Sequence, residues 1–259
     1  TYRRHTNFAM ESIEQTFNGQ ADFGRRVTCT VSRNGDLAYR TYLQVTLPEI
    51  NQSMANKTTD EDTGVYARWL DFPGHQLISQ VEVEIGGQRI DRQYGDWMHI
   101  WMQLTLTSEQ QRGYYKMIGN TTQLTFITDP SFSDIDGPCE SAAPRQVCAP
   151  RNALPETTLY IPLQFWFCRN PGLALPLIAL QYHEVRFNID LRPIEECLWA
   201  VSSLSECPGG NKVTTAYQQS LVAASLYIDY IFLDTDERRR MAQNPHEYLI
   251  EQLQFTGDE

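Results

Sequence analysis

The sequence predicts an all-β protein whose sheets pack as a sandwich, with short helices in the loops. Two strand patterns near the middle of the 259-residue chain carry this prediction. Residues 159–167 and 185–191 place an apolar side chain at every second position, the period of a strand that buries one face. Aromatic residues, with 13 Tyr, 11 Phe and 5 Trp, favour broad sheets. A chain of this length and 41% hydrophobic content can bury a full core.

The first three strands are expected near the N-terminus. Alternating apolar residues mark them at 13–17, 27–31 and 37–47. Asn34-Gly35 separates the second run from the third. Asn-Gly between alternating runs is a strong hairpin signal, because both residues tolerate positive φ in a type I′ turn. We therefore expect the second and third strands to pair with each other.

A second hairpin is expected at 81–91, where valine and isoleucine alternate with glutamate before a Gly-Gly pair. Two helices should follow. Asp96 is expected to cap the first, and Ser108 with Gln111 resembles a capping box for the second, which should end near Gly119. The first helix is expected to bury an apolar face at helical spacing, formed by Trp97, Ile100, Trp101 and Leu104.

Two further strands and a capped helix are expected. A short strand is expected at 124–127, and a long alternating run predicts the last strong strand at 226–232. Asp234 with Glu237 forms a capping box for a helix that should run through Met241. Polar stretches without periodicity predict exposed loops at 51–64, 129–158 and 202–220.

Residues 248–255 form a further strand pattern after what is already a complete sandwich. Ile250-Glu251-Gln252 matches the Ile13-Glu14-Gln15 of the first strand. The match is short and needs a one-residue offset beyond these three residues, so chance and an internal repeat both stay open from it alone. Pro245 ends the helix before this segment, a position that favours a repeat. The chain is therefore expected to have three parts: a first sandwich domain at 1–233, a linker helix at 234–247, and the first strand of a second, similar domain at 248–259.

Charge and hydropathy argue against two classes of protein. A formal net charge of −11 is unsuited to a nucleic-acid surface, because phosphate contacts need clustered Lys and Arg. The basic cluster Arg238–Arg240 follows acidic residues and is expected to be a solvated helix face. No apolar run reaches the roughly 20 residues of a transmembrane helix. We find no signal peptide, and because Thr1 is not an initiator we expect the natural start to be missing.

The sequence contains no catalytic or metal-binding pattern. The five histidines stand singly, without the H-E-x-x-H or C-x-x-C spacing of a zinc site. His183-Glu184 is expected to be a polar strand edge, and Asp134–Gly137 a turn, because it lacks the later ligands of a calcium loop. We therefore expect no enzyme activity, no cofactor and no metal. Three triplets fit the N-glycosylation acceptor pattern and mainly indicate exposed loops, at Asn51, Asn56 and Asn120.

The six cysteines are too few for a disulfide scaffold in a chain of this size. Cys29 and Cys168 lie within strand patterns and are expected to be small buried apolar residues. Disulfide pairing stays open for two pairs in loop-like stretches, Cys139 with Cys148 and Cys197 with Cys207.

Four blocks of sequence resemble the major capsid proteins of nucleocytoplasmic large DNA viruses, the group of phycodnaviruses, iridoviruses and relatives. The blocks span nearly the whole chain and follow the family's order, and the variable stretches fall where this family varies its loops. The blocks are RRHTNFAMESIEQTFNG (3–19), VEIGGQRIDRQYGDWMHIW (83–101), LYIPLQFWFCRNPGLALPLIALQYHEV (159–185) and YIDYIFLDTDERRRMAQNPHEYLIEQLQF (227–255).

This resemblance implies a double jelly roll, with the first eight-stranded jelly roll and the opening strand of the second in this chain. It implies a structural subunit that trimerises into pseudo-hexagonal capsomers and builds an icosahedral shell. The implied partners are other copies, neighbouring capsomers and minor capsid proteins. Direct nucleic-acid contact is not expected, and contact with an inner viral membrane would be indirect. The implied location is the virion capsid, assembled in the host cytoplasm.

The alternative from another class is a carbohydrate-binding or carbohydrate-cleaving jelly-roll domain, since lectin-like sandwiches share the architecture and fold alone does not decide function. A sugar site would need exposed aromatic side chains beside Asp and Asn. Tyr160 and Trp166 could supply them. Their strand is apolar on both faces, which favours burial in an interface instead.

Overall fold

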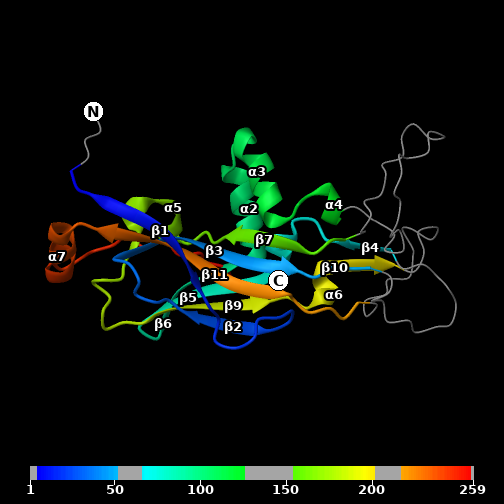
Figure 1. The fold of residues 1–259 in the computed structure, drawn as a ribbon, viewed down its shortest axis with the longest axis horizontal. Coiled ribbons are helices and arrows are strands. Elements are labelled where there is room, and N and C mark those ends of the chain that lie inside the picture. The colour runs from blue at the N-terminus through cyan, green and yellow to red at the C-terminus, as the bar shows by residue number, and fades with distance from the viewer. Residues whose placement is uncertain (1–4, 52–65, 126–153, 202–216, 258–259) are drawn as a thin grey trace.

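Two antiparallel sheets packed face to face carry the fold (Figure 1). The computed structural model describes residues 5–51, 66–125, 154–201 and 217–257. The first sheet has the order β1 (Phe8–Gln15), β11 (Ala223–Leu233), β3 (Leu37–Leu47) and β7 (Thr157–Pro162). The second has the order β2 (Arg26–Thr30), β9 (Val185–Leu191), β5 (Ile78–Ile85) and β6 (Gln88–Tyr94). Three short strands lie outside these rows: β8 (Leu175–Pro176) on β3, and β4 (Tyr66–Trp69) paired with β10 (Leu198–Val201).

The winding of these eight strands is that of a jelly roll. Along the chain, each successive strand passes from one sheet to the other, and only β5 and β6 are consecutive neighbours in the same sheet. Such a path gives two four-stranded sheets whose sequence neighbours face each other across the core. The structure thus confirms the all-β sandwich that the alternating patterns predict and the jelly roll that the resemblance implies.

The core lies between the two sheets and follows the predicted strand faces. Phe187 and Ile189 of β9 are both buried, as their alternation with polar residues predicts. Phe165 and Phe167 reach the same core from the other sheet's side, with ring centroids 5.9 and 6.2 Å from that of Phe187. Each such ring pair adds roughly 0.5–1.5 kcal/mol beyond its buried area.

The predicted hairpin between 27–31 and 37–47 is wrong. β2 pairs with β9, and β3 pairs with β11 and β7, so the two runs lie in different sheets. Asn34-Gly35 lies in the crossing between the sheets, and φ of Gly35 is not positive, as a type I′ turn would require. Glycine is needed there for another reason. A Cβ on Gly35 would lie 2.6 Å from the Cβ of Tyr230, so only glycine lets the crossing pass this close to β11.

The second predicted hairpin is confirmed. β5 and β6 pair directly, and Gly86 and Gly87 join them with φ values of 61° and 81°. Both values lie in the left-handed region that a type I′ turn needs and that glycine adopts without strain.

The strand predicted at 159–167 is too long. β7 ends at Pro162, and α5 (Trp166–Arg169) begins four residues later. Pro162 cannot donate a ladder hydrogen bond, and after it only the Leu163 N–H still donates to Thr41 of β3, at 2.9 Å, before α5 begins. The predicted apolar residues are nevertheless all buried, because α5 packs against β3 and turns its aromatic side chains into the core.

The helices between β6 and β7 rise from one side of the sandwich (Figure 1). They are α2 (Gly95–Thr105), α3 (Ser108–Ile118) and the single turn α4 (Thr122–Thr125), and α1 (Pro73–Leu77) precedes β5. The predicted C-cap Gly119 is confirmed, with a φ of 81°. The predicted N-caps are wrong by one or two residues, because Tyr94 and Thr107 occupy these positions without a side-chain cap. The strand predicted from 124 is wrong, since its first residues belong to α4.

The predicted apolar face of α2 is only partly buried. Ile100 and Leu104 are exposed, and the helix packs instead through Gly95 and Met98. A Cβ on Gly95 would lie 2.2 Å from the carbonyl oxygen of His75, so the glycine allows α2 to contact the backbone of α1. Helical spacing indicates an amphipathic helix but cannot say what covers its apolar face.

The C-terminal helix α7 (Thr235–Gln243) begins where it is predicted. Asp234 is its N-cap and accepts a hydrogen bond from the backbone N–H of Thr235 at 2.7 Å. The predicted capping box is not formed, because Glu237 pairs with Arg240 instead. Arg238 is not purely solvated as expected, because it pairs with Asp36 at 3.0 Å and ties α7 to the start of β3. Two shorter elements complete the described chain, α6 (Ile194–Cys197) and the 3-10 turn η2 (Pro171–Leu173).

The strand predicted at 248–255 is not formed, and this segment runs as irregular chain along the sandwich. The loops predicted at 51–64, 129–158 and 202–220 lie mostly outside the described residues. Within the described part of the chain, no helix has the length and apolar character needed to cross a membrane.

Candidate functional site

Histidines lie close together in the packing between α1, α2 and α3. The rings of His75 and His99 are 5.6 Å apart, and His75 Nε2 is 2.6 Å from the Tyr114 hydroxyl. Burial, with a smaller contribution from His99, lowers the pKa of His75 to about 4, so this side chain is neutral at physiological pH. Within the described ranges no third ligand joins them, and no group of three or more His, Cys, Asp or Glu could hold a metal. The pair is therefore part of the helix packing.

The His183-Glu184 pair is a polar surface, in agreement with the sequence. Glu184 pairs with Arg186, and the His183 ring lies against the β5–β6 turn, where a Cβ on Gly86 would meet its Nδ1 at 2.7 Å. Nothing in this arrangement holds the two side chains as an acid and a base. The turn predicted at Asp134–Gly137 lies outside the described residues.

The cysteines of the described chain are structural. Cys29, Cys168 and Cys197 are buried and free, and burial raises the pKa of each thiol, to about 11 for Cys29 and about 12 for the other two. A thiol with so high a pKa is a poor nucleophile. Cys168 lies in α5 rather than in a strand. The suggested partners Cys139, Cys148 and Cys207 lie outside the described residues.

Two of the three glycosylation triplets can be placed. Asn120 is half-buried, and its Oδ1 accepts a hydrogen bond from the backbone N–H of Phe72 at 3.2 Å. Phe72 has a φ of 54°, unusual for a residue with a side chain, so Asn120 supports a strained turn before α1. Asn51 is half-buried and donates to Glu49 at 3.3 Å, and Asn56 lies outside the described residues. Glycosylation of all three stays a prediction.

The outer face of the β2-β9-β5-β6 sheet is an ionic network centred on Glu82 of β5. The Glu82 side chain is only 6% exposed and lies 2.6 Å from Arg92, 2.9 Å from Arg26 and 3.6 Å from Arg89. Burial by itself raises the pKa of Glu82, but hydrogen bonds and charge from Arg92 and Arg26 outweigh it, so the pKa is lowered. The carboxylate is therefore ionised and fully paired.

Neighbouring polar side chains extend this network across the sheet. Asn188 of β9 accepts from Thr28 at 2.9 Å and donates to Glu84 at 3.2 Å. Asp190 of β9 pairs with Arg26 at 3.2 Å. Most of the charged and amide groups on this face therefore bind one another, while Asp190 Oδ1 has no hydrogen-bond partner among the described residues.

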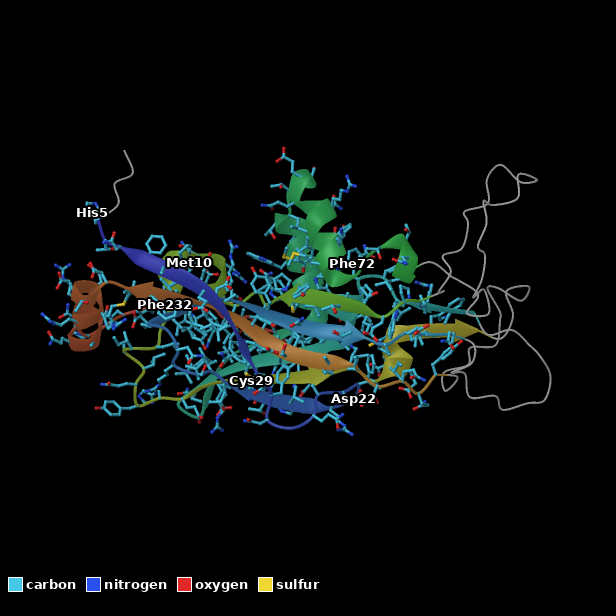
Figure 2. All side chains as sticks on the ribbon, in the orientation of Figure 1. His5, Met10, Asp22, Cys29, Phe72 and Phe232 are labelled. Carbon is cyan, nitrogen blue, oxygen red and sulfur yellow. The ribbon has the colours of Figure 1, made fainter. Side chains whose placement is uncertain are left out.

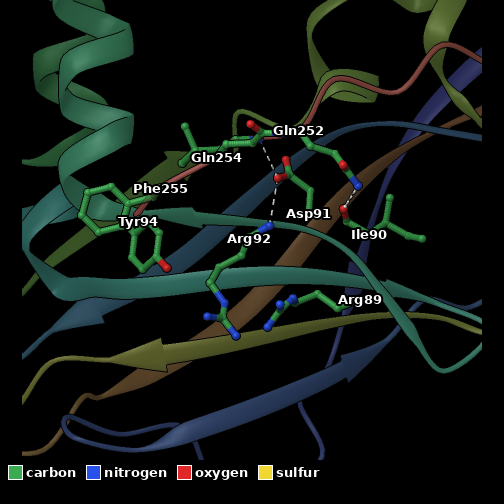
Figure 3. Close-up of a pocket in the computed structure, with 9 residues that line it drawn as sticks. Arg89, Ile90, Asp91, Arg92, Tyr94, Gln252, Gln254 and Phe255 are labelled. Carbon is green, nitrogen blue, oxygen red and sulfur yellow. Dashed lines mark hydrogen bonds between the residues drawn. The ribbon is translucent and has the colours of Figure 1, made fainter. Parts of the chain in front are cut away.

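The edge strand β6 is covered by residues 251–255, which we call the C-terminal strap (Figure 3). The backbone N–H of Leu253 donates to Asp91 Oδ1 at 3.1 Å, and the Gln252 side chain donates to the carbonyl oxygen of Ile90. Figure 3 shows the Phe255 ring beside that of Tyr94, with centroids 5.2 Å apart. The strap and β6 border a hollow of about 260 Å³.

Two side chains hold the strap on this side of the sandwich. Asp91 is 3% exposed, and burial raises its pKa against the opposing effect of hydrogen bonds from Leu253 and Arg92. Arg169 pairs with Glu251 at 2.9 Å, and its guanidinium lies 3.9 Å from the centroid of the Trp101 ring. Sequence patterns did not predict these contacts, because they join residues far apart in the chain.

The two aromatic residues considered for a sugar site do not form one. Tyr160 is 44% exposed on β7, whereas Trp166 is 2% exposed and belongs to α5. Trp166 packs against Phe167 at a centroid distance of 5.0 Å, so it serves the core. The carbohydrate alternative therefore has no support.

Comparison with known protein families identifies one match over most of the chain. The family described as the N-terminus of the major capsid protein matches residues 1–234. The chain is 77% identical to the major capsid protein of Chrysochromulina ericina virus and 79% identical to that of Phaeocystis pouchetii virus. In both alignments it is covered completely and covers 48% of the relative, so it spans about half the length of these proteins.

Solved structures agree with this match. The chain superposes on the VP54 protein of PBCV-1 with a TM-score of 0.69 and 36% identity, covering 99% of this chain and 50% of that one. The Faustovirus major capsid protein, at 14% identity, gives a TM-score of 0.60 over 92% of this chain and 57% of that one, which shows the shared fold.

Proposed function

The chain belongs to the major capsid protein family of large DNA viruses, and we propose that it is the N-terminal half of a structural subunit that builds an icosahedral shell. The observation that carries this proposal is a match over the whole of this chain, at 77% and 79% identity, to about half the length of two viral major capsid proteins. The buried thiols, the neutral His75 and the lack of a metal cluster in the described residues fit a role without catalysis. In this proposal the protein has no enzyme activity and no cofactor, in keeping with the name of its relatives as major capsid proteins.

The proposed assembly is a homotrimer that forms a pseudo-hexagonal capsomer. A jelly roll whose second copy follows in the same chain gives six sandwiches in a trimer, which suits a pseudo-six-fold ring. Its partners are other copies, neighbouring capsomers and minor capsid proteins. The net charge of −11 disfavours direct contact with the genome. Any contact with an inner viral membrane is proposed to be indirect. The proposed location is the virion capsid, after assembly in the host cytoplasm.

The proposed domain organisation keeps the boundaries expected from the sequence. Residues 1–233 are the first jelly roll, 234–247 a linker helix, and 248–259 the start of a second jelly roll. Two observations support this division. Every main strand of the sandwich lies before residue 234, and the chain covers only 48% of its two relatives. In this proposal, residues 248–255 become a strand when the strands of the second half are present to pair with them.

The solution mass of the full-length protein tests the proposed function. Size-exclusion chromatography with light scattering should give three times the mass of one chain at micromolar concentration. Electron microscopy of the same sample should show particles with a six-sided outline. A protein that remains monomeric over the whole accessible concentration range would contradict the proposal.

A further inference from the structure

The edge strand β1 is exposed on both faces over its first five residues. Phe8, Ala9, Met10, Glu11 and Ser12 are each exposed to solvent, although all of β1 is paired in register with β11. Within the described residues, β11 is the only strand that pairs with β1, so the other edge of β1 carries backbone groups without a ladder partner. Figure 2 shows β1 crossing the front of the molecule, with Met10 labelled on it.

The exposed residues extend a small apolar cluster to the surface. In the β1–β11 register, Phe8 lies opposite Leu233 and Met10 opposite Ile231, and opposed residues of an antiparallel pair share a face. Ile231 is buried in a cluster separate from the main core, and Leu233 packs against that cluster. Phe8 and Met10, at 57% and 49% exposed, continue this apolar surface outward. The members of the buried cluster are Leu37, Tyr39, Ala174 and Ile231.

The sequence of β1 lacks the features that protect an exposed edge strand. FAMESIEQ contains no Lys, Arg or Pro, and its charges are the two glutamates Glu11 and Glu14. Natural edge strands that face water are usually short, bulged, covered, or protected by Lys or Pro. An edge of eight residues with exposed Phe and Met is therefore typical of a strand that a partner covers.

The path of the chain decides between two candidate partners, the second half of the same chain and another copy. β1 lies beside β2, because Asn18 after β1 donates to Thr28 of β2 at 2.8 Å. β6 is joined to the segment after β7, where Gln93 donates to the carbonyl oxygen of Gln164 at 2.8 Å. In the stacked sheets β1 therefore lies over β2 and β7 lies over β6, so that the edge strands β1 and β6 are on opposite sides of the sandwich. The chain leaves the sandwich along β6, on the side away from β1.

From this geometry we propose that β1, through Phe8, Met10 and its free edge, is a contact surface for a second copy of the protein. The proposal deepens the proposed function, on which it rests, by naming the surface through which the copies meet. Because residues 251–255 of each copy already lie on β6, we expect the β1 side of one copy to meet a different surface of its neighbour. Such a heterologous contact generates a ring when its rotation closes, as a trimer requires.

A charge placed on β1 tests the proposal in the full-length protein. Met10→Glu puts a carboxylate into the contact, and Val222→Glu makes the same change at a site that is apolar and 55% exposed but lies outside β1. Light scattering over a dilution series should show that Met10→Glu raises the dissociation concentration of the trimer by about tenfold or more, since a charge in an interface centre costs at least about 1.4 kcal/mol. The Val222→Glu protein should stay within about twofold of wild type.

Three outcomes would contradict the assignment of β1. Met10→Glu could leave the dissociation concentration unchanged, or both variants could raise it equally. Hydrogen exchange of the Phe8–Ser12 amides that point away from β11 gives the third outcome, since the other amides are protected by the β1–β11 ladder itself. Protection of these outward-facing amides in the dissociated subunit would mean that the second half of the same chain covers β1. Thermal melting of the dissociated Met10→Glu subunit should match wild type, which separates lost assembly from lost folding. A wild-type protein that never assembles would contradict the proposed function as well as the role of β1.

Discussion

The two edge strands β1 and β6 end their sheets on opposite sides of the sandwich and differ in what covers them. β6 carries charged and polar residues, and the C-terminal strap contacts it at the Asp91 carboxylate, the Ile90 carbonyl oxygen and the Tyr94 ring. β1 carries Phe8 and Met10 and, among the described residues, has β11 as its only strand neighbour. The comparison teaches that the β6 edge is covered by its own chain, whereas the β1 edge is left open for the second copy of the protein that we propose as its partner.

The largest expected effect on stability comes from a substitution in the core between the two sheets, which supports both β1 and β6. Phe187→Ala should lower the free energy of unfolding by about 3–5 kcal/mol, because it loses the transfer energy of the ring and leaves a cavity beside Phe165 and Phe167. Urea denaturation followed by tryptophan fluorescence measures this loss. A loss below about 1 kcal/mol would contradict the strand face that both edges depend on.

The second prediction removes the ionic network beside β6 and leaves β1 untouched. Glu82→Gln leaves Arg26, Arg89 and Arg92 without their shared carboxylate and should cost about 1–2 kcal/mol, reduced from the value for a fully buried pair because the arginines are partly exposed. Urea denaturation measures it. Glu11→Gln on exposed β1 is the matched control and should change stability by less than about 0.5 kcal/mol.

The stability difference between wild type and Glu82→Gln should depend on pH in one direction. The pKa of Glu82 is lowered in the folded protein, so its contribution is fully present above the unfolded value of about 4.3. It is lost as the pH falls through the lower folded-state pKa. The stability gap between wild type and Glu82→Gln should therefore be constant near pH 7 and should shrink below pH 4. A gap that grows on acidification would contradict the assignment.

Local patterns in the sequence predicted the parts of the fold that depend on local physics. The alternation of β9 and β11, the Gly86-Gly87 turn and the Asp234 cap are each decided within a few residues, and the structure confirms all three. Asn34-Gly35 shows the limit of this reasoning. Its neighbours have the pattern of a hairpin, but their partners are strands more than a hundred residues away, and partner choice is a property of the whole chain.

The contact surfaces were harder to predict than the core. Burial explains why Phe165 and Phe167 look like strand residues although α5 interrupts the strand, since both conformations bury them. No sequence pattern indicated which apolar side chains would be exposed on the surface. Helical spacing predicted that Ile100 and Leu104 lie on an apolar helix face, but it could not distinguish a face buried in the core from one on the surface. Both residues are exposed. The strap contacts of Asp91 and Leu253 lie 162 residues apart and left no local pattern.

A third prediction concerns the hydrogen bond that holds the strap to β6. Asp91→Ala removes the acceptor of the Leu253 N–H and should speed hydrogen exchange of that amide by about tenfold or more, as expected for a charge-assisted hydrogen bond of about 1.5–3 kcal/mol. Asp91→Asn keeps an acceptor oxygen and is the control, so the Leu253 amide should exchange within about threefold of wild type. Equal exchange in wild type and Asp91→Ala would mean that the strap is not held through this residue.

The smallest expected effect compares two phenylalanines that are almost equally exposed, Phe255 at 56% in the strap and Phe8 at 57% on β1. Phe255→Ala loses the ring contact with Tyr94 and should weaken strap docking in the isolated subunit by about 0.5–1 kcal/mol, measured by hydrogen exchange of the strap amides. Phe8→Ala should leave the stability of the dissociated subunit within about 0.5 kcal/mol of wild type, because a surface side chain without a local partner contributes little. In the assembled protein the order should reverse, with Phe8→Ala raising the dissociation concentration more than Phe255→Ala. If Phe8→Ala destabilised the dissociated subunit more than Phe255→Ala does, β1 would be closed by its own chain as β6 is, and the difference between the two edges would disappear.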